Sequence, residues 1–378
     1  MKPHCGLPCS SSYKRYAFFI AIGARCLSLK SSIAYDDAPY CALLSTTHCM
    51  GSSIFLMGPL LARFGEVTVS KPGGCVIGQR PIDFHLRGMR ALGARIEEEH
   101  GDIRCTAKRL LGTHIALDFP SVGATENLLM AAALADGTTV IENAAREPEV
   151  VDLANFLREA GVRIEGAGHD RIVVHGCSEL REIGYRIIPD RIVTGTLMLA
   201  AAATMGKITL TGAEPGHLGA VIQKLRDAGV RVDTEHDIIT LICDGAPSAV
   251  DFRTAPFPGF PTDLQAPFMA FLTVAQGTSV IQESVFEARF KHVDELLRMG
   301  ADISVDLRTA IVRGVPNLSG AKVCASDLRG GAALLVAGLA ASGVTEVDGV
   351  YHIDRGYQAI EAHLSTVGAR IERIKVND

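Results

Sequence analysis

A loop interrupted by glycine and proline places a thiol, two cations and a carboxylate between Lys71 and Asp83. Two glycines before Cys75 let the backbone adopt conformations that a β-carbon forbids, and they hold the thiol clear of its neighbours. Lys71 and Arg80 supply positive charge, which favours a reactive thiolate or binds an anion. The segment is therefore predicted to be an active-site loop. The alternative is an ordinary hairpin loop that contains a buried cysteine.

Polar residues also gather at two recurring places in the rest of the chain: the start of an alanine-rich helix, and the loop before an amphipathic helix. Several helix N-termini that point into one cleft create an anion site, because free backbone N–H groups and the helix dipole favour phosphate. Arginines would add bidentate donors. The simpler interpretation is that the acidic and hydroxyl residues are N-caps and the arginines form surface pairs. The residues concerned are Ser121, Asp190, Asp263 and Asp327 at helix starts, with Arg80, Arg289, Arg329 and Arg355 as the cations.

The elements that must position these residues form a repeat. A helix ending in Gly, then Ala or Val, a charged residue and Ile or Val, occurs five times, with the glycines at positions 93, 161, 229, 300 and 368. The copies are 68, 68, 71 and 68 residues apart, a regularity typical of duplicated units. Between copies, an alanine-rich helix ends at a glycine, and a short alternating strand follows. The pattern predicts α/β units in which helices cover sheets and the alanine-rich helix is buried in a bundle.

Pro189 and Asp190 interrupt the repeat and mark the predicted domain boundary, because a proline followed by an N-capping aspartate opens a new helix. We expect a divergent or truncated segment over 1–49, one repeat domain over 50–189 and a second over 190–378. Units grouped in threes require six copies, but only 49 residues precede Met50, so the first repeat is expected to be incomplete. The polar loops are expected to lie at equivalent edges of the two domains and to face each other across a cleft.

Length and composition exclude several function classes. The 378 residues are 48% hydrophobic and carry a formal charge of -5, which argues against a nucleic-acid binder. An anionic ligand must therefore be met by a few placed cations. Ten cysteines without a C-x-x-C pair indicate reduced thiols in a cytosolic protein. The apolar run at 16–23 is short and is followed by Arg25, which disfavours a cleaved signal peptide. No segment approaches the roughly 20 apolar residues that span a bilayer.

From about Met50 onward, the chain resembles the UDP-N-acetylglucosamine 1-carboxyvinyltransferase (enolpyruvyl transferase) family in four phrases, at residues 72–83, 137–149, 254–265 and 351–357. The resemblance implies a two-domain inside-out α/β barrel, shared with the shikimate-phosphate enzyme. It also implies transfer of the enolpyruvyl group of phosphoenolpyruvate to the 3′-hydroxyl of UDP-N-acetylglucosamine with release of phosphate. This is the first committed step of peptidoglycan synthesis in a bacterial cytoplasm. The two substrates are the implied partners, without nucleic acid, membrane, metal or redox cofactor, and the oligomeric state stays open.

The family pattern also implies residue roles. Cys75 matches the reactive cysteine of a mobile loop, which attaches to phosphoenolpyruvate and is alkylated by the antibiotic fosfomycin. Asp263 matches the carboxylate beside the sugar hydroxyl, a candidate general base, and Asp327 matches a second acidic residue. Arg80 and Arg355 match ligands of the phosphoenolpyruvate phosphate, and Arg329 matches another arginine of the cleft. The nucleotide-sugar pocket is matched by Arg80, Pro81, Ile82, Asp83, Phe84, Ser121, Val122, Gly123 and Val285, with Arg289 beside it.

Several family residues have no counterpart in this chain. The N-terminal Gly-x-Lys-Asn-x-x-Leu-Pro phrase is absent, which a deletion or a reading-frame change before Met50 would explain. Gly51 replaces an arginine, Ala288 an asparagine, and Phe119 a lysine that some members carry. These departures keep open the hypothesis of a catalytically impaired nucleotide-sugar binder. A third hypothesis, the sister shikimate-pathway enzyme, is disfavoured by the Cys75 loop and by the phrases of the uridine pocket.

Overall fold

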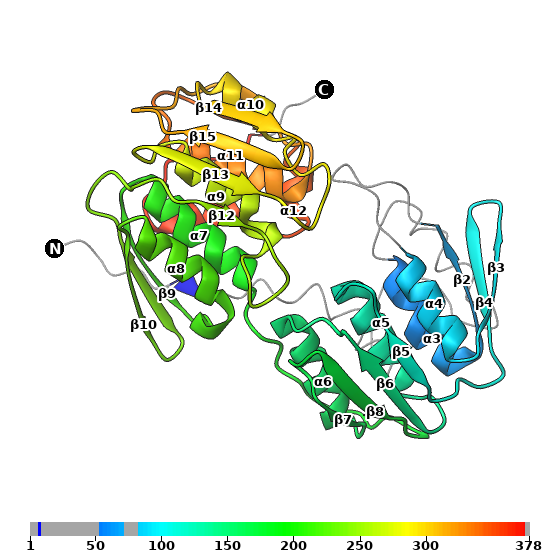
Figure 1. The fold of residues 1–378 in the computed structure, drawn as a ribbon. Helices are drawn as coiled ribbons and strands as arrows, with labels where there is room; N and C mark the ends of the chain where they lie inside the picture. The colour runs from blue at the N-terminus through cyan, green and yellow to red at the C-terminus, as the bar shows by residue number, and fades with distance from the viewer. Residues whose placement is uncertain (1–6, 9–52, 72–81, 375–378) are drawn as a thin grey trace. The chain divides into compact units, whose positions relative to one another are not determined.

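The computed structural model describes residues 7–8, 53–71 and 82–374. Within these ranges the chain forms two compact units (Figure 1). The first unit runs to Ile188, and the second comprises Leu7–Pro8 and the chain from Pro189 onward. The predictions for Cys75, Arg80 and Pro81, and for segment 1–49 apart from Leu7–Pro8, lie outside the described residues.

The first unit alternates helices with short strands, as the repeat predicts. Its sheets have the strand orders β2-β4-β3 and β5-β6-β8-β7. The elements in chain order are η2 (Ser53–Leu56), α3 (Met57–Phe64), β2 (Glu66–Ser70), α4 (Asp83–Ala91), β3 (Arg95–Glu99), β4 (Asp102–Thr106), β5 (His114–Ala116), α5 (Val122–Ala132), β6 (Thr138–Glu142), α6 (Pro148–Glu159), β7 (Arg163–Glu165) and β8 (Arg171–His175).

The second unit follows the same alternation over a longer stretch of chain. Its elements are β1 (Leu7–Pro8), α7 (Arg191–Ala203), β9 (Lys207–Thr211), η3 (Pro215–Leu218), α8 (Gly219–Asp227), β10 (Arg231–Glu235), β11 (Ile238–Ile242), β12 (Phe252–Arg253), η4 (Thr262–Leu264), α9 (Gln265–Leu272), β13 (Thr278–Gln282), α10 (Val293–Arg298), β14 (Asp302–Asp306), β15 (Thr309–Arg313), β16 (Lys322–Cys324), α11 (Leu328–Ala340), β17 (Glu346–Asp348), α12 (Tyr351–Asp354) and α13 (Ile360–Thr366).

The four-stranded sheets share one plan. A short strand pairs in parallel with a longer one, which continues into an antiparallel pair, in the orders β5-β6-β8-β7, β12-β13-β15-β14 and β1-β9-β11-β10. In the third sheet, β1 at the start of the chain takes the place that β5 and β12 take in the others, with Leu7 opposite Leu210. The β2-β4-β3 sheet and the parallel β16-β17 pair are partial versions of this plan. The sheets therefore confirm the predicted duplication of α/β units.

The five glycines of the repeat phrase all have left-handed backbone conformations. Their φ angles are 97° at Gly93, 109° at Gly161, 83° at Gly229, 87° at Gly300 and 98° at Gly368. They follow α4, α6, α8, α10 and α13, where a left-handed residue ends the helix and a β-carbon would be strained. The glycine of the repeated phrase is therefore explained by the left-handed backbone conformation at the end of each helix.

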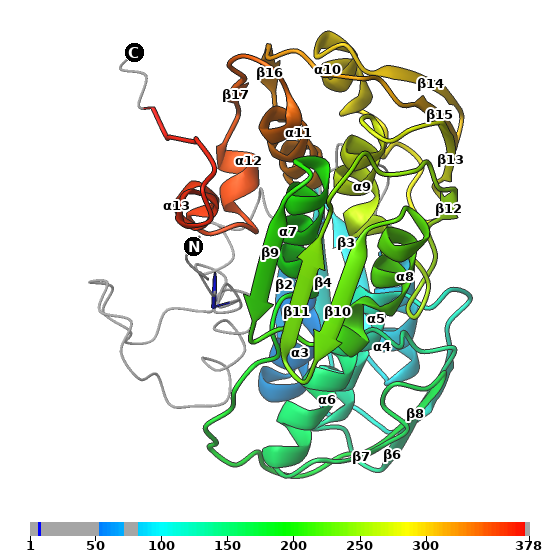
Figure 2. The same cartoon turned by 90° about the vertical axis from the view of Figure 1, so that its left-hand side faces the viewer.

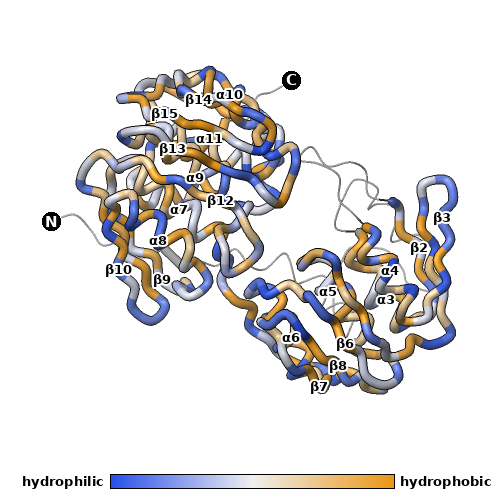
Figure 3. The backbone as a smooth tube through the Cα atoms, viewed as in Figure 1, coloured by the Kyte–Doolittle hydropathy of each residue, from blue (hydrophilic) through white to orange (hydrophobic). Residues whose placement is uncertain are grey.

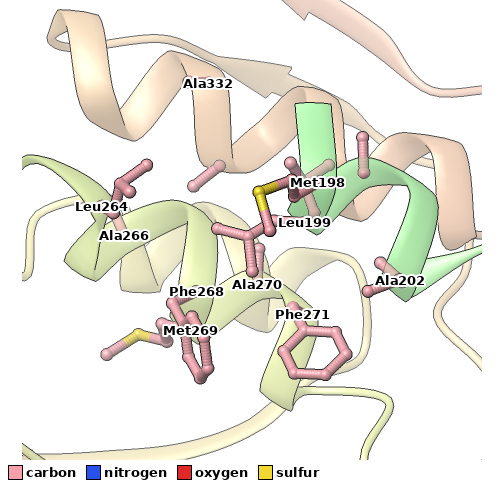
Figure 4. Close-up of a cluster of buried hydrophobic side chains, with 14 of the residues drawn as sticks. Met198, Leu199, Ala202, Leu264, Ala266, Phe268, Met269, Ala270, Phe271 and Ala332 are labelled. Carbon is pink, nitrogen blue, oxygen red and sulfur yellow. The ribbon is translucent and has the colours of Figure 1, made fainter. Parts of the chain in front are cut away.

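The core of the second unit lies between its three alanine-rich helices, as predicted. α7, α9 and α11 pack against one another, and Figure 4 shows buried side chains from these helices, such as Met198 and Leu199 of α7 and Phe271 of α9. Small residues allow close approach, since a β-carbon on Gly195 would lie 2.4 Å from Leu264 Cδ1. The strands β9, β11 and β10 lie side by side beside α7 (Figure 2), and hydrophilic residues mark hairpin tips such as that of β10 and β11 (Figure 3). In the first unit, α5 takes the central place between α3, α4 and α6.

Candidate functional site

Asp263 lies between two buried arginines in the second unit. Its Oδ1 accepts a hydrogen bond from Nη2 of Arg289 at 2.6 Å, and its Oδ2 accepts one from Nη2 of Arg329 at 2.7 Å. The arginine side chains are only 4% and 6% exposed, whereas the Asp263 side chain is 32% exposed. Such charge-assisted contacts are short and strong. The structure therefore brings together Asp263 and Arg289 from one repeat and Arg329 from the next.

Each member of this cluster comes from a different element. Asp263 lies in η4, directly before α9, and Arg329 is the second residue of α11. Arg289 lies in the loop between β13 and α10, where its guanidinium carbon lies 4.9 Å from the centre of the Phe286 ring. Atoms Nε and Nη1 of Arg289 are buried and have no hydrogen-bond partner among the described residues. The loop thus offers two cationic donors beside the carboxylate.

Three of the four predicted helix starts carry side-chain N-caps, at Ser121, Asp190 and Asp327, whereas Asp263 caps no helix. The simpler interpretation therefore holds for these caps but not for the two buried arginines of the Asp263 cluster. The Asp190 carboxylate accepts from the backbone N–H groups of Ile192 and Val193 at the start of α7. Asp327 Oδ1 accepts from the N–H groups of Arg329 and Gly330, both at 2.9 Å. Each cap satisfies donors that the first helical turn leaves open. For Asp327, the cap also fixes the backbone of the arginine that contacts Asp263.

Tyr357 also contacts the Arg329 guanidinium, through the Nη1 atom that Asp263 does not bind. Its hydroxyl accepts from Nη1 of Arg329 at 3.2 Å and lies 2.9 Å from the hydroxyl of Thr196 on α7. Burial raises the pKa of the Tyr357 hydroxyl, and the charge of Arg329 opposes this shift. Burial by itself would lower the pKa of Arg329, but the charge of Asp263 and its hydrogen bond raise it above its ordinary value. Arg329 therefore stays cationic in this buried position.

Arg355 and Val285 lie on segments tied to the same cluster. Arg355 directly follows α12, only two residues before Tyr357, and its side chain is exposed. Within the described part of the chain, this side chain makes no hydrogen bond or ion pair, although the backbone N–H of Arg355 donates to the Ile353 carbonyl. Val285 lies in the loop that carries Arg289 and is partly buried. The second unit therefore holds one exposed arginine close in sequence to the buried cluster.

The first unit carries the remaining predicted residues at the starts of two adjacent helices. Ile82, Asp83 and Phe84 begin α4, and Ser121, Val122 and Gly123 begin α5, where the Ser121 hydroxyl accepts from the N–H of Ala124. The described residues therefore place these two predicted pocket segments on neighbouring helices.

His85 and Asn127 join these two helices in the interior. The Asn127 side chain donates to Nδ1 of His85 at 2.9 Å and to the Ile54 carbonyl, and it accepts from the N–H of Gly58 at 2.7 Å. Burial lowers the pKa of His85 to about 4, so the imidazole is neutral at pH 7 and Nδ1 is its acceptor nitrogen. A β-carbon on Gly123 would lie 3.5 Å from this ring. Sequence reasoning missed this pair, although a histidine and an asparagine on otherwise apolar helix faces were available signals.

Comparisons with known proteins identify the family. The family model for EPSP synthase (3-phosphoshikimate 1-carboxyvinyltransferase) matches residues 21–364. The UDP-N-acetylglucosamine 1-carboxyvinyltransferase 2 of Caldanaerobacter subterraneus subsp. tengcongensis is 54% identical over 326 residues, covering 86% of this chain and 78% of that protein. The chain belongs to the EPSP synthase family. A UDP-N-acetylglucosamine 1-carboxyvinyltransferase 1 of Symbiobacterium thermophilum is 55% identical over 329 residues, covering 87% of this chain and 75% of that protein. The resemblance stated from the sequence is thereby confirmed.

Solved structures agree with this family. The enolpyruvyl transferase NikO from Streptomyces tendae matches with a TM-score of 0.76 and 28% identity, over 87% of this chain and 78% of that one. An EPSP synthase from Acinetobacter baumannii matches with a TM-score of 0.64 at 20% identity, over 85% of this chain and 78% of that one, which supports the fold alone. The predicted enolpyruvyl transferase fold is confirmed, and the chain is a carboxyvinyltransferase by family.

Among the described residues, no group of three or more His, Cys, Asp or Glu side chains has the arrangement of a metal site. None of the helices in this part of the chain combines the length and apolarity that a membrane span requires.

Proposed function

We propose that this carboxyvinyltransferase transfers the enolpyruvyl group of phosphoenolpyruvate to the 3′-hydroxyl of UDP-N-acetylglucosamine and releases phosphate. The observation that carries the proposal is the Asp263 cluster, a partly exposed carboxylate held by two buried arginines. It occurs in a chain that is 53–55% identical to proteins named for this reaction. The proposal extends to a role in peptidoglycan synthesis in the cytoplasm, which the resemblance to this family implies.

The reaction has an addition and an elimination. The sugar oxygen bonds to C2 of phosphoenolpyruvate while a proton is added to C3, which gives a tetrahedral ketal. The bond from C2 to the phosphate oxygen then breaks, C3 loses a proton, and the double bond forms again. Charge develops in both steps, and fixed cations stabilise it without reorganisation. In this proposal Arg355 and Arg80 bind the phosphate, and Asp327 is a second acidic residue of the site.

Asp263 is the proposed acceptor of the hydroxyl proton. Two guanidinium contacts favour the ionised carboxylate but also make it a weaker base. We therefore expect substrate binding to lengthen at least one of the two contacts, because an arginine that turns towards the phosphate leaves Asp263 more basic. The exposed part of the Asp263 side chain is the surface at which the hydroxyl would approach.

The nucleotide-sugar pocket is proposed to use Arg80, Pro81, Ile82, Asp83 and Phe84 with Ser121, Val122, Gly123, Val285 and Arg289. Support comes from the family match and from the neighbouring helices α4 and α5, which carry four of these residues and are each directly preceded by one more, Ile82 and Ser121.

A phosphate-release assay with both substrates tests this function. We expect turnover on the order of 1 per second or more, and none when either substrate is left out. Asp263→Asn should lower kcat about 100-fold, because the acceptor of the hydroxyl proton is lost. Calorimetric binding of UDP-N-acetylglucosamine without any phosphate release would contradict the proposal and would favour the impaired binder.

The Cys75 thiol is proposed as the group that attaches to phosphoenolpyruvate and is alkylated by fosfomycin. Mass spectrometry after incubation with fosfomycin should show one adduct on the peptide that contains Cys75. The Cys75→Ser variant should show none, because a hydroxyl is a far weaker nucleophile than a thiolate. Adducts on Cys177 or Cys324 instead would contradict this assignment.

A further inference from the structure

Glu283 is a buried carboxylate whose recorded partners are all neutral. It directly follows β13, and only 1% of its surface is exposed. Oε1 accepts from the Thr254 hydroxyl at 2.8 Å and from the backbone N–H groups of Val285 and Phe286 at 2.8 and 3.1 Å. Oε2 accepts from the Thr262 hydroxyl at 2.9 Å. A buried carboxylate is costly unless hydrogen bonds satisfy it, so this position needs a specific explanation.

The repeat shows that the fold itself does not need this carboxylate. The residue that follows the corresponding strand is Asn143 after β6, Gly212 after β9 and Gly349 after β17, with φ angles of 53°, 69° and 72°. All three make a left-handed turn, for which glycine and asparagine are suited. Glu283 is not among the residues with positive φ. Lys71, which follows β2, also lacks a positive φ, but at the β13 copy a buried side-chain carboxylate binds two backbone N–H groups in place of the left-handed turn.

The four contacts join two of the three segments that carry the Asp263 cluster, the η4 segment of Asp263 and the loop of Arg289. Thr262 is the neighbour of Asp263 in η4, and Val285 and Phe286 begin the loop that leads to Arg289. Thr254 adds a third tie, since its Oγ1 also accepts from the N–H of Ser284 at 2.9 Å. These contacts form a closed ring: Glu283 binds Thr262, the neighbour of Asp263, the Asp263 carboxylate pairs with Arg289, and the loop of Arg289 leads back to Glu283. Glu283 is therefore hydrogen-bonded both to the segment that carries Asp263 and to the loop that carries Arg289, and it fixes the distance between them.

We infer that Glu283 is a positioning residue of the carboxyvinyl transfer site. It sets the distance between the Asp263 carboxylate and the loop of Val285 and Arg289, and it does not touch the substrates itself. This inference rests on the proposed function, because it concerns the geometry of the same site. Misplacement of a reacting group by about 1 Å can cost on the order of 100-fold in rate, so a loosened ring should appear in the kinetics.

Three variants separate positioning from mere structural support. Glu283→Met removes every acceptor at similar volume, Glu283→Gln keeps one oxygen for the backbone N–H groups, and Thr262→Val cuts only the tie to η4. Ser279→Ala is the control, because Ser279 is also buried and loses only a neutral hydrogen bond to the Val250 N–H. Initial rates are measured at a temperature where circular dichroism shows each variant to be fully folded.

We expect Glu283→Met to lower kcat about tenfold or more and to raise KM for UDP-N-acetylglucosamine, with KM for phosphoenolpyruvate much less affected. Glu283→Gln should recover most of both losses, and Thr262→Val should lower kcat alone. Ser279→Ala should lower the melting temperature without changing kcat. Values of kcat and KM within twofold of the wild type for Glu283→Met would overturn the inference.

The design separates this inference from the proposed function. If Glu283→Met does not fold, Thr262→Val decides, because an unchanged kcat in that variant overturns the role of the ring. A wild-type protein that neither releases phosphate nor binds UDP-N-acetylglucosamine refutes the proposed function, and the positioning role falls with it. An active wild type with active variants refutes the positioning role only.

Discussion

Replacing Asp263 by asparagine tests whether this carboxylate makes two buried arginines tolerable. Nη2 atoms of Arg289 and Arg329 bind its two oxygens at 2.6 and 2.7 Å. Asparagine keeps the shape but offers one oxygen and one NH₂ group, so one guanidinium would face a donor. Two buried cations would then lie beside each other without their shared anion. The loss should therefore be larger than for removal of either arginine.

The expected magnitude follows from the exposure of the three side chains. Removing one partner of a buried ion pair costs about 3–5 kcal/mol. Because the Asp263 side chain is 32% exposed, water screens part of this, and we expect a loss of about 2–4 kcal/mol. Arg329→Met leaves Asp263 paired with Arg289, so that change should cost only about 1–2 kcal/mol. The asymmetry between the two variants is the main prediction.

Urea unfolding followed by circular dichroism at pH 7.5 measures these losses in the transition of the second unit. Asp302→Asn is a matched control, because Asp302 makes an exposed pair with Arg313 at 3.1 Å, and its loss should be about 0.5 kcal/mol or less. If Asp263→Asn costs less than Arg329→Met, or no more than the control, the account of the cluster is refuted.

Three further predictions concern groups outside this pair. Burial lowers the pKa of both His85 and His292 from 6.5 to about 4, so only the unfolded state takes up these protons between pH 6.5 and 4. The free energy of unfolding should be level above pH 6.5 and fall on acidification, by about 2 kcal/mol per histidine at pH 5. If urea unfolding of His85→Gln shows the same loss of stability between pH 6.5 and 5 as the wild type, the prediction for His85 is wrong. Tyr357→Phe should cost about 1–3 kcal/mol by urea unfolding, because Arg329 Nη1 loses its buried acceptor; no change in stability would exclude that contact. Gly58→Ala should lower the melting temperature markedly, because the added β-carbon would lie 2.4 Å from the Asn127 backbone oxygen and would overpack the contact between α3 and α5. An unchanged melting temperature would contradict this, because it would show that the two helices can move apart at no cost.

The features that the sequence predicted correctly are those that depend on neighbours along the chain. A left-handed helix end needs glycine whatever lies around it, so Gly93 and its four equivalents revealed the repeat. An N-cap needs an acceptor one residue before the helix, so Asp190 and Asp327 could be placed at helix starts. Burial of the alanine-rich helices followed from their composition, because a helix that is apolar on every side must be enclosed.

The features that were missed depend on contacts between distant segments. Asn127 bonds to Ile54 and Gly58, about seventy residues earlier, and Tyr357 meets Thr196 across 161 residues. The hydrophobic periodicity of a helix shows only that a polar residue interrupts its apolar face, and it does not indicate which distant residue forms the hydrogen bond. Glu283 is the clearest case, because its role becomes visible only when the turns after the corresponding strands are compared. The pairing of Asp263 with both arginines was likewise outside the reach of spacing alone.

N-capping and site formation were posed as alternatives for the polar helix starts, yet in α11 an N-cap and a buried ion pair occur together. Asp327 binds the backbone N–H of Arg329, which fixes the first turn and thus the direction in which the arginine leaves the helix. The cap uses one carboxylate oxygen and satisfies donors that the turn leaves open, so it stabilises the helix by itself. The arginine two residues later then reaches Asp263 from a fixed backbone. The acidic N-cap therefore has two effects in α11: it stabilises the helix start, and it holds the backbone of Arg329 so that the guanidinium reaches Asp263.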